Sequence, residues 1–177
     1  KEPPPRTTVH DLLRRAQEHE AAERWAQAVV DYRVVIIHFY RKSCKMPSAM
    51  NTQAGIYAQS RIKGIIEKKG RAVYARFDRE ANALLAKAKT VEEYRYVVER
   101  YSNAEAMSPA LIALSELHMR TGKYAEAAAV LREHRYKCRG WKRDLEVLAR
   151  LALSYKAQGR PDLARSVLRL MLRTRPE

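Results

Sequence analysis

The stretch SELHMRTGKYAEAAAVL, residues 115–131, decides the fold. A small residue is followed by a ring three residues on, a glycine seven on and a tyrosine nine on, and then by a second small residue and a large apolar one. In order, these six repeat positions hold Ser115, His118, Gly122, Tyr124, Ala127 and Leu131. Side chains three or four residues apart share one helix face, and glycine permits a tight turn. The stretch therefore predicts two closely packed antiparallel helices.

The same spacing recurs three more times in the chain. The C-terminal copy is Ala152, Tyr155, Gly159, Pro161, Ala164 and Leu168, the N-terminal copy is Ala16, His19, Glu23, Trp25, Ala28 and Tyr32, and a weaker copy is Asn82, Leu85, Lys89, Val91, Tyr94 and Val98. Only the N-terminal and weaker copies lack glycine at the turn. Such repetition predicts an all-α fold, an α-solenoid of about nine helices whose antiparallel pairs bury their apolar faces on one another.

Composition agrees with an all-helical chain. The 177 residues are 46% hydrophobic, with only 6 Gly and 7 Pro, and strong helix formers dominate. No stretch approaches the roughly 20 apolar residues of a transmembrane helix, and residues 1–7 lack the apolar core of a secretory signal. The cysteines, Cys44 and Cys138, belong to no close-spaced set. We therefore expect two free thiols, with one long-range disulfide as the alternative.

The repeat spacing resembles the tetratricopeptide repeat (TPR), whose period is about 34 residues. Two copies match well, one lacks the turn glycine and one is degenerate, and together they cover about two thirds of the chain. The resemblance divides the chain into six segments. These are a linker at 1–7, a TPR-like unit at 8–42, an irregular basic helical segment at 43–71, a degenerate unit at 72–107, a TPR unit at 108–140 and a C-terminal unit at 141–177.

A looser resemblance concerns the whole chain. In chain order there are residues 32–35 (YRVV), a basic helix, residues 74–81 (YARFDREA), residues 97–101 (VVERY) and then a strong repeat. This order is similar to that of the helical N-terminal region of certain bacterial proteins. Those proteins continue into a pyrroloquinoline-quinone-type β-propeller. The resemblance implies a scaffold in the bacterial envelope or periplasm, and the alternative location is the cytoplasm.

The net charge of +15 is concentrated in two segments. Residues 41–81 carry ten basic and three acidic side chains, and residues 132–177 carry thirteen and five. This asymmetry predicts an acidic partner such as RNA, anionic lipid or acidic protein. Aromatic residues lie among the basic ones, a pattern that either binds single-stranded nucleic acid or is solvated surface. The patch residues are Arg41, Lys42 and Lys45, and Tyr136, Lys137, Arg139, Trp141, Lys142 and Arg143.

The sequence shows no arrangement typical of catalysis. Its five histidines form no His-x-x-x-His pair, the cysteines have no zinc-ligand spacing, and no glycine-rich phosphate loop is present. His19 and His118 occupy the ring position of the repeat, which favours packing. The carboxylates follow amphipathic faces, as solvated surface does. We therefore expect no enzyme, no metal, no cofactor and no small-molecule substrate.

In the TPR family the first helix of each repeat lines a groove that holds a partner. By position, the resemblance implies groove residues Leu13, Gln17, Arg79, Ala83, Ile112, Glu116, Arg120, Leu153 and Lys156. The cations Arg79, Arg120 and Lys156 form a rim suited to an acidic peptide. Leu13 and Gln17 replace the family's carboxylate clamp of Lys and Asn, so binding of chaperone tails is not implied.

These observations favour a non-catalytic protein–protein interaction scaffold within a larger protein or complex, one that binds acidic or extended segments. The alternative is an RNA-associated basic subunit that uses the two basic patches. Steep weakening of binding with salt would favour the second, because phosphate contacts release counterions.

Overall fold

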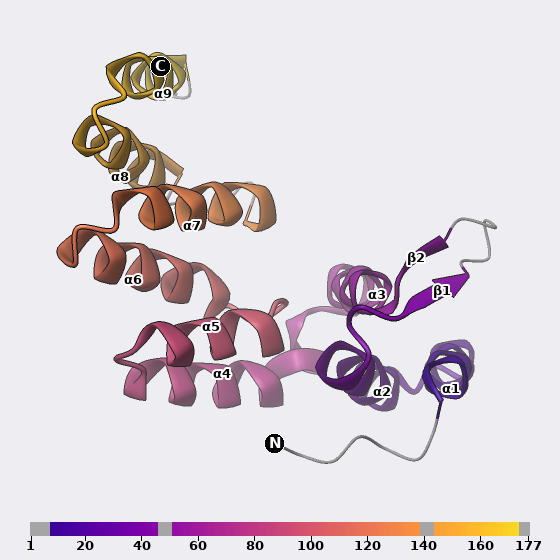
Figure 1. The fold of residues 1–177 in the computed structure, drawn as a ribbon. Coiled ribbons are helices and arrows are strands. Elements are labelled where there is room, and N and C mark those ends of the chain that lie inside the picture. The colour runs from indigo at the N-terminus through magenta and orange to yellow at the C-terminus, as the bar shows by residue number, and fades with distance from the viewer. Residues whose placement is uncertain (1–7, 46–50, 139–143, 174–177) are drawn as a thin grey trace. The chain divides into compact units, whose positions relative to one another are not determined.

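The computed structural model describes residues 8–45, 51–138 and 144–173 of the chain. Within these ranges it has nine α-helices, one short 3-10 helix and one two-stranded antiparallel hairpin (Figure 1). Consecutive helices contact each other in antiparallel pairs. The predicted all-α class and the helix number are confirmed for this part of the chain.

The chain forms two compact units. Unit 1 comprises Lys1–Ala81 and Arg100–Ala104, and unit 2 comprises Asn82–Glu99 and Glu105–Glu177. Helix α4, Ala75–Lys87, begins in unit 1 and ends in unit 2.

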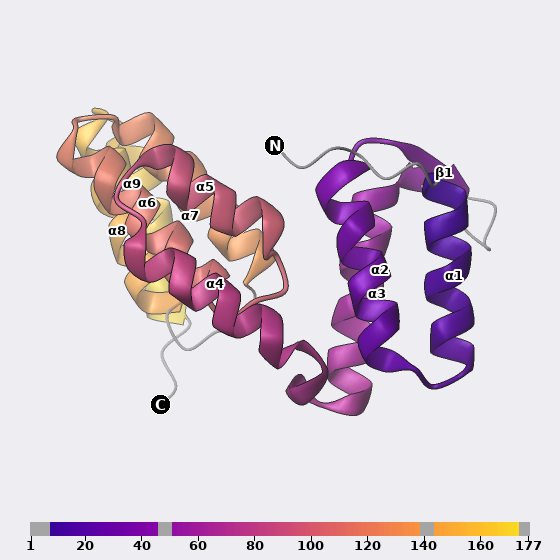
Figure 2. The ribbon, with the colours of Figure 1, turned by 90° about the horizontal axis from the view of Figure 1, so that it is seen from below.

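Unit 1 is built on three helices that lie side by side (Figure 2). They are α1 (Val9–Ala21), α2 (Trp25–His38) and α3 (Ala54–Lys69), and the 3-10 helix η1 (Arg71–Tyr74) follows them. The Thr8 side chain caps α1 by accepting a hydrogen bond from the Asp11 N–H, at 3.2 Å.

A small hairpin precedes α3, and the sequence did not predict it. Strands β1 (Ser43–Lys45) and β2 (Asn51–Gln53) pair with Cys44 opposite Thr52. Helix α3 begins at Ala54, directly after the backbone of 51–53 that is engaged in strand pairing.

Unit 2 is a succession of helix pairs, seen as successive layers in Figure 1. Its helices after α4 are α5 (Val91–Arg100), α6 (Met107–Arg120), α7 (Tyr124–Lys137), α8 (Asp144–Ala157) and α9 (Pro161–Arg173). Helix α6 contacts α7, α7 contacts α8, and α8 contacts α9. One apolar cluster joins α6 to α9, and it contains Ile112, Ala128, Leu131, Val147, Leu148, Leu151, Ala152, Tyr155, Ala164 and Val167.

Three helix turns share one backbone geometry. The turn residues Glu23, Gly122 and Gly159 have φ angles of 56°, 71° and 70°. The N–H after each turn residue donates to the carbonyl of the residue at the ring position. The donors and acceptors are Arg24 and His19 at 2.8 Å, Lys123 and His118 at 2.8 Å, and Arg160 and Tyr155 at 2.9 Å. This six-residue closure ends a helix with a left-handed residue. The three turns at the predicted turn position therefore end their helices in the same way.

Burial follows the small-residue positions of the repeat in three copies. Ala16, Ala28, Ser115 and Ala127 are all 0% exposed, and Ala152 and Ala164 are 6% and 7% exposed, as close helix contact requires. In the weaker copy the expected small residue, Asn82, is exposed, whereas Ala81 is 0% exposed. The predicted position is therefore wrong by one residue there, because several small side chains stand next to one another in α4.

Candidate functional site

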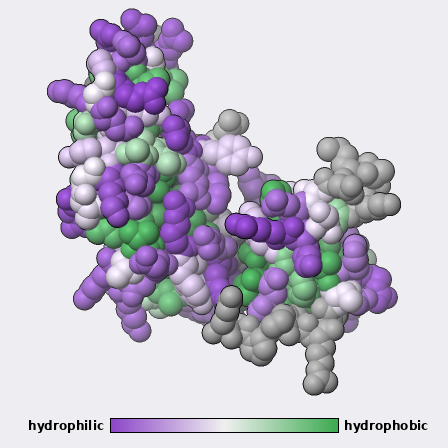
Figure 3. Space-filling model, viewed as in Figure 1, coloured by the Kyte–Doolittle hydropathy of each residue, from purple (hydrophilic) through white to green (hydrophobic). Residues whose placement is uncertain are grey.

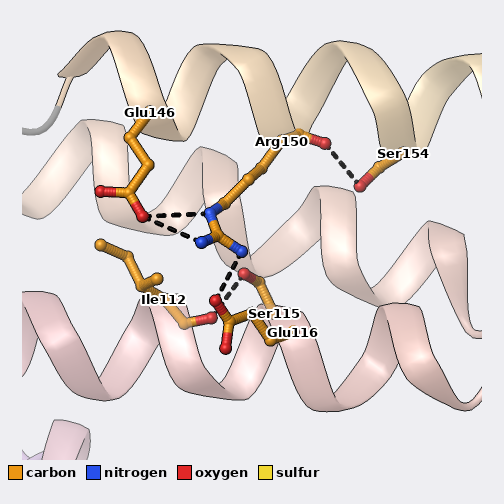
Figure 4. Close-up of polar contacts among 6 residues, drawn as sticks. All are labelled: Ile112, Ser115, Glu116, Glu146, Arg150 and Ser154. Carbon is orange, nitrogen blue, oxygen red and sulfur yellow. Dashed lines mark hydrogen bonds and ion pairs between the residues drawn. The ribbon is translucent and has the colours of Figure 1, made fainter.

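The candidate site is the face that α6 and α8 share in unit 2. Arg150 of α8 lies between two carboxylates (Figure 4). Its Nη1 is 2.6 Å from Glu116 Oε1 on α6, and its Nη2 is 2.9 Å from Glu146 Oε1 one turn earlier on α8. Arg150 therefore joins the first helices of two successive pairs, and its guanidinium is 26% exposed beside carboxylates that are each 40% exposed.

Two buried serines lie behind this face, and the hydroxyl of each donates a hydrogen bond to a backbone carbonyl of its own helix. Ser115 Oγ donates to the Ile112 carbonyl at 2.7 Å, and Ser154 Oγ donates to the Arg150 carbonyl at 2.9 Å. Both side chains are 0% exposed. A serine that donates to the preceding turn and has no contact with solvent is a packing residue. Neither hydroxyl is placed to contact a ligand.

Exposed residues follow on the same two helices toward their C-terminal ends. Arg120 lies one turn after Glu116, and Leu153 and Lys156 lie three and six residues after Arg150. Leu153 is 55% exposed. Arg120 and Lys156 are exposed, and neither has an acidic partner within the described ranges. The face thus combines an apolar anchor with two unpaired cations.

Hydrophilic side chains cover most of the surface seen in Figure 3, and hydrophobic ones are visible among them over α8 and α9. A mixture of hydrophilic and hydrophobic side chains is ordinary for a protein surface. The charged side chains around each exposed leucine of α8 and α9 therefore determine which partner can bind there.

Some of the predicted groove residues are not on a surface. Leu13 is 7% exposed and Ile112 is 5% exposed, so the expectation that they line a groove is wrong. Both sit where helix packing takes priority. Gln17 is exposed, but it donates to the Tyr57 hydroxyl at 2.8 Å. Arg79 is exposed on the part of α4 that belongs to unit 1, whereas Arg120 and Lys156 belong to unit 2.

The first basic patch lies in unit 1. Arg41 and Lys42 are exposed just before the hairpin, and Lys45 lies in β1. The second patch lies at the end of α7 in unit 2, where Tyr136 is 78% exposed and Lys137 Nζ is 2.8 Å from Glu133 Oε1. Its other members, Arg139, Trp141, Lys142 and Arg143, lie outside the described residues.

A buried arginine in unit 1 was not predicted. Arg33 of α2 is 5% exposed, and its guanidinium lies over the rings of Phe77 and Tyr101, at 4.1 and 4.2 Å from their centroids. It also donates to the Tyr74 hydroxyl at 3.2 Å. The one sequence signal was a cation within the apolar run that follows Tyr32. The contact between Arg33 and Tyr101 holds the segment 100–104 against the rest of unit 1.

Burial favours the uncharged form of three titratable side chains, those of His118, Cys44 and Tyr32. Burial lowers the pKa of His118, so the ring is neutral near pH 7. Burial raises the pKa of the Cys44 thiol, and Cys44 and Cys138 are both buried. Burial, with a hydrogen bond to Glu20, raises the pKa of Tyr32. A protonated thiol is a poor nucleophile, and the burial of these side chains fits packing roles.

Within the described ranges, no three His, Cys, Asp or Glu side chains are grouped as metal ligands would be. None of the helices in that part of the chain is both long and apolar enough to span a bilayer. The sequence matches no protein-family model and no curated protein.

Proposed function

We propose that the chain is a TPR-type α-solenoid that serves as a non-catalytic protein-interaction scaffold, and that the α6–α8 face of unit 2 holds an acidic, extended segment of a partner. The observation that carries this proposal is that the first helices of two successive pairs expose a leucine, Leu153, and two unpaired cations, Arg120 and Lys156. The repeated turn geometry supports the solenoid.

Each residue of the face has a separate task in this proposal. Leu153 supplies the apolar anchor, and covering it contributes about 1 kcal/mol, since it is about half exposed in the free chain. Arg120 and Lys156 pair with carboxylates of the partner at about 0.2–1 kcal/mol each, because both are solvent-exposed. Arg150 keeps α6 and α8 at a fixed spacing. These contributions predict weak binding by one face, so several helix pairs must contribute to a stable complex.

RNA binding is the second candidate, and one observation favours it. Tyr136 is 78% exposed beside Lys137, in the more basic of the two segments of the chain. A stacking ring next to cations is typical of single-strand binding. Against it, Lys137 is already paired with Glu133 on the same helix.

Two double variants with the same change in charge distinguish these candidates. One is Arg120→Glu with Lys156→Glu on the α6–α8 face, and the other is Arg135→Glu with Lys137→Glu on either side of Tyr136 at the end of α7. The probes are a fluorescein-labelled acidic peptide that contains leucines and a labelled uridine oligonucleotide, with binding followed by fluorescence anisotropy.

The scaffold proposal predicts that the first variant loses the peptide and the second retains it. Peptide binding should also persist when salt is raised, because an apolar anchor contributes. Tight oligonucleotide binding that only the second variant loses would favour the RNA reading. Equal loss of peptide in both variants would show attraction by net charge alone and would refute the assigned face.

A further inference from the structure

Helix α9 exposes leucines on a face that no other described helix covers. Leu168 is 48% exposed and Leu172 is 70% exposed. Together with Met171 and with Leu145 of α8, they line an open pocket of about 520 Å³. Ala164 and Val167 of the same broad apolar face pack on α8, and Leu168 lies one turn after Ala164 on that face. The apolar face of α9 is therefore wider than the part that α8 covers.

The same repeat position is buried in every other helix pair. Leu168 is the last of the six repeat positions, and its equivalents Tyr32, Val98 and Leu131 are each 0% exposed. Leu131 shares one apolar cluster with Leu148 of α8, the helix that follows α7. In α7, then, a helix covers this position. The repeat itself thus indicates the kind of element that fits on α9, an amphipathic helix.

Arginines border the exposed leucines of α9. Arg169 is the equivalent of Arg132, which donates to the Tyr155 hydroxyl of α8 at 3.3 Å. Arg169 and Arg173 have no acidic partner within the ranges that the structure describes, whereas Arg165 pairs with Asp162. A helix seated on α9 would meet these cations along its edge. Acidic side chains are therefore favoured on that edge.

We propose that this face of α9 docks an amphipathic helix of a partner protein, seated as α8 is on α7, with acidic residues facing Arg169 and Arg173. A second copy of the chain fits less well. Two α9 faces packed on each other would bring their arginines together, and like charges are costly at an interface. Helix α1 offers no matching surface either, because its exposed side carries ion-paired Arg14, Asp11 and Glu18.

The binding face consists of other residues than those of the α6–α8 face, so the two proposals fail independently. The probe is a peptide with the sequence of residues 144–157, labelled with fluorescein, with Arg150 and Lys156 replaced by Glu, and held helical by a lactam bridge. A short peptide is otherwise poorly helical in water. Fluorescence anisotropy measures its affinity for the complete 177-residue chain.

The expected result is at least a tenfold loss of affinity in Leu168→Glu, with Leu172→Glu as the second variant. Leu153→Glu is the matched control, because that leucine is similarly exposed on α8. The double variant Arg169→Glu with Arg173→Glu should weaken the acidic peptide and leave the unaltered 144–157 peptide unaffected. Circular dichroism confirms that each variant is folded.

Three outcomes would overturn the proposal. In the first, the peptide fails to bind the wild-type chain. In the second, Leu153→Glu abolishes binding while Leu168→Glu does not, and this result places the peptide on the α6–α8 face. The third is a concentration-dependent dimer in sedimentation velocity that Leu168→Glu dissociates. That dimer would identify a second copy of the chain as the occupant.

Discussion

Replacing the turn glycine Gly122 by alanine tests the repeat directly, because it changes one methyl group and one backbone preference. Gly122 has a φ of 71°, and a Cβ added there would meet no heavy atom within 4 Å. The cost is therefore conformational and not steric. An L-residue in the left-handed region costs about 1–2 kcal/mol, and alanine returns about 0.4–1 kcal/mol by restricting the unfolded chain. We expect a net destabilisation of about 1 kcal/mol from these two terms.

Gly64 provides a matched control for this substitution. It lies within α3, it is exposed, and an added Cβ also meets nothing within 4 Å. Its backbone is helical, so alanine should stabilise the protein by about 0.5–1 kcal/mol. The same chemical change thus has opposite signs at the two sites.

Urea denaturation followed by circular dichroism measures both variants against the wild type, and thermal unfolding provides a second reading. At this chain length, 1 kcal/mol corresponds to a shift in Tm of about 2–4 °C. We expect a lower Tm for Gly122→Ala and a higher Tm for Gly64→Ala. Equal effects of the same sign, or a stabilising Gly122→Ala, would refute the assignment of Gly122 as a left-handed closing residue.

Three more predictions concern the turn, the buried arginine and acid stability. Glu23→Gly should raise stability by about 1 kcal/mol, because φ is 56° there and glycine removes the left-handed strain; unchanged urea unfolding would contradict it. A double-mutant cycle of Arg33→Met and Phe77→Leu should give a coupling of about 1–2 kcal/mol from the buried cation–π contact, and a value near zero would refute that contact. Hydrogen bonds from the backbone N–H groups of Lys89 and Thr90 lower the pKa of Glu93. The ionised Glu93 carboxylate therefore stabilises the fold at a pH above its ordinary pKa, and this contribution is lost as the pH falls below that value. Glu93→Gln should therefore flatten the acid limb of a stability–pH curve, and an unaltered limb would show that these two hydrogen bonds do not stabilise the fold.

Much of the fold follows from local spacing. The turn glycines Gly122 and Gly159 end helices for a reason that is legible in the sequence, since only glycine adopts that backbone at no steric cost. Glu23 is different, because only alignment of the repeats places it in the same conformation. The hairpin at 43–53 was missed because strands of three residues carry no recognisable alternation.

The site was less predictable than the fold. The i,i+4 pair of Glu146 and Arg150 is visible in the sequence, but the bridge from Arg150 to Glu116 depends on the spacing of α6 and α8. Exposure of Leu153 and Leu168 depends on which helix covers each position, and amphipathic periodicity does not state that. Burial of Arg33 needs rings from two distant segments, and no local pattern brings them together.

Chemical-shift mapping of the isotope-labelled chain, titrated with the acidic leucine-containing peptide, tests the central claim most directly. The account predicts that shift changes concentrate on the exposed side of α6 and α8, around Arg120, Leu153 and Lys156, with the amides of unit 1 unmoved. Changes centred on Arg41 and Lys42 or on Tyr136, or a uniform small shift across all exposed cations, would contradict it.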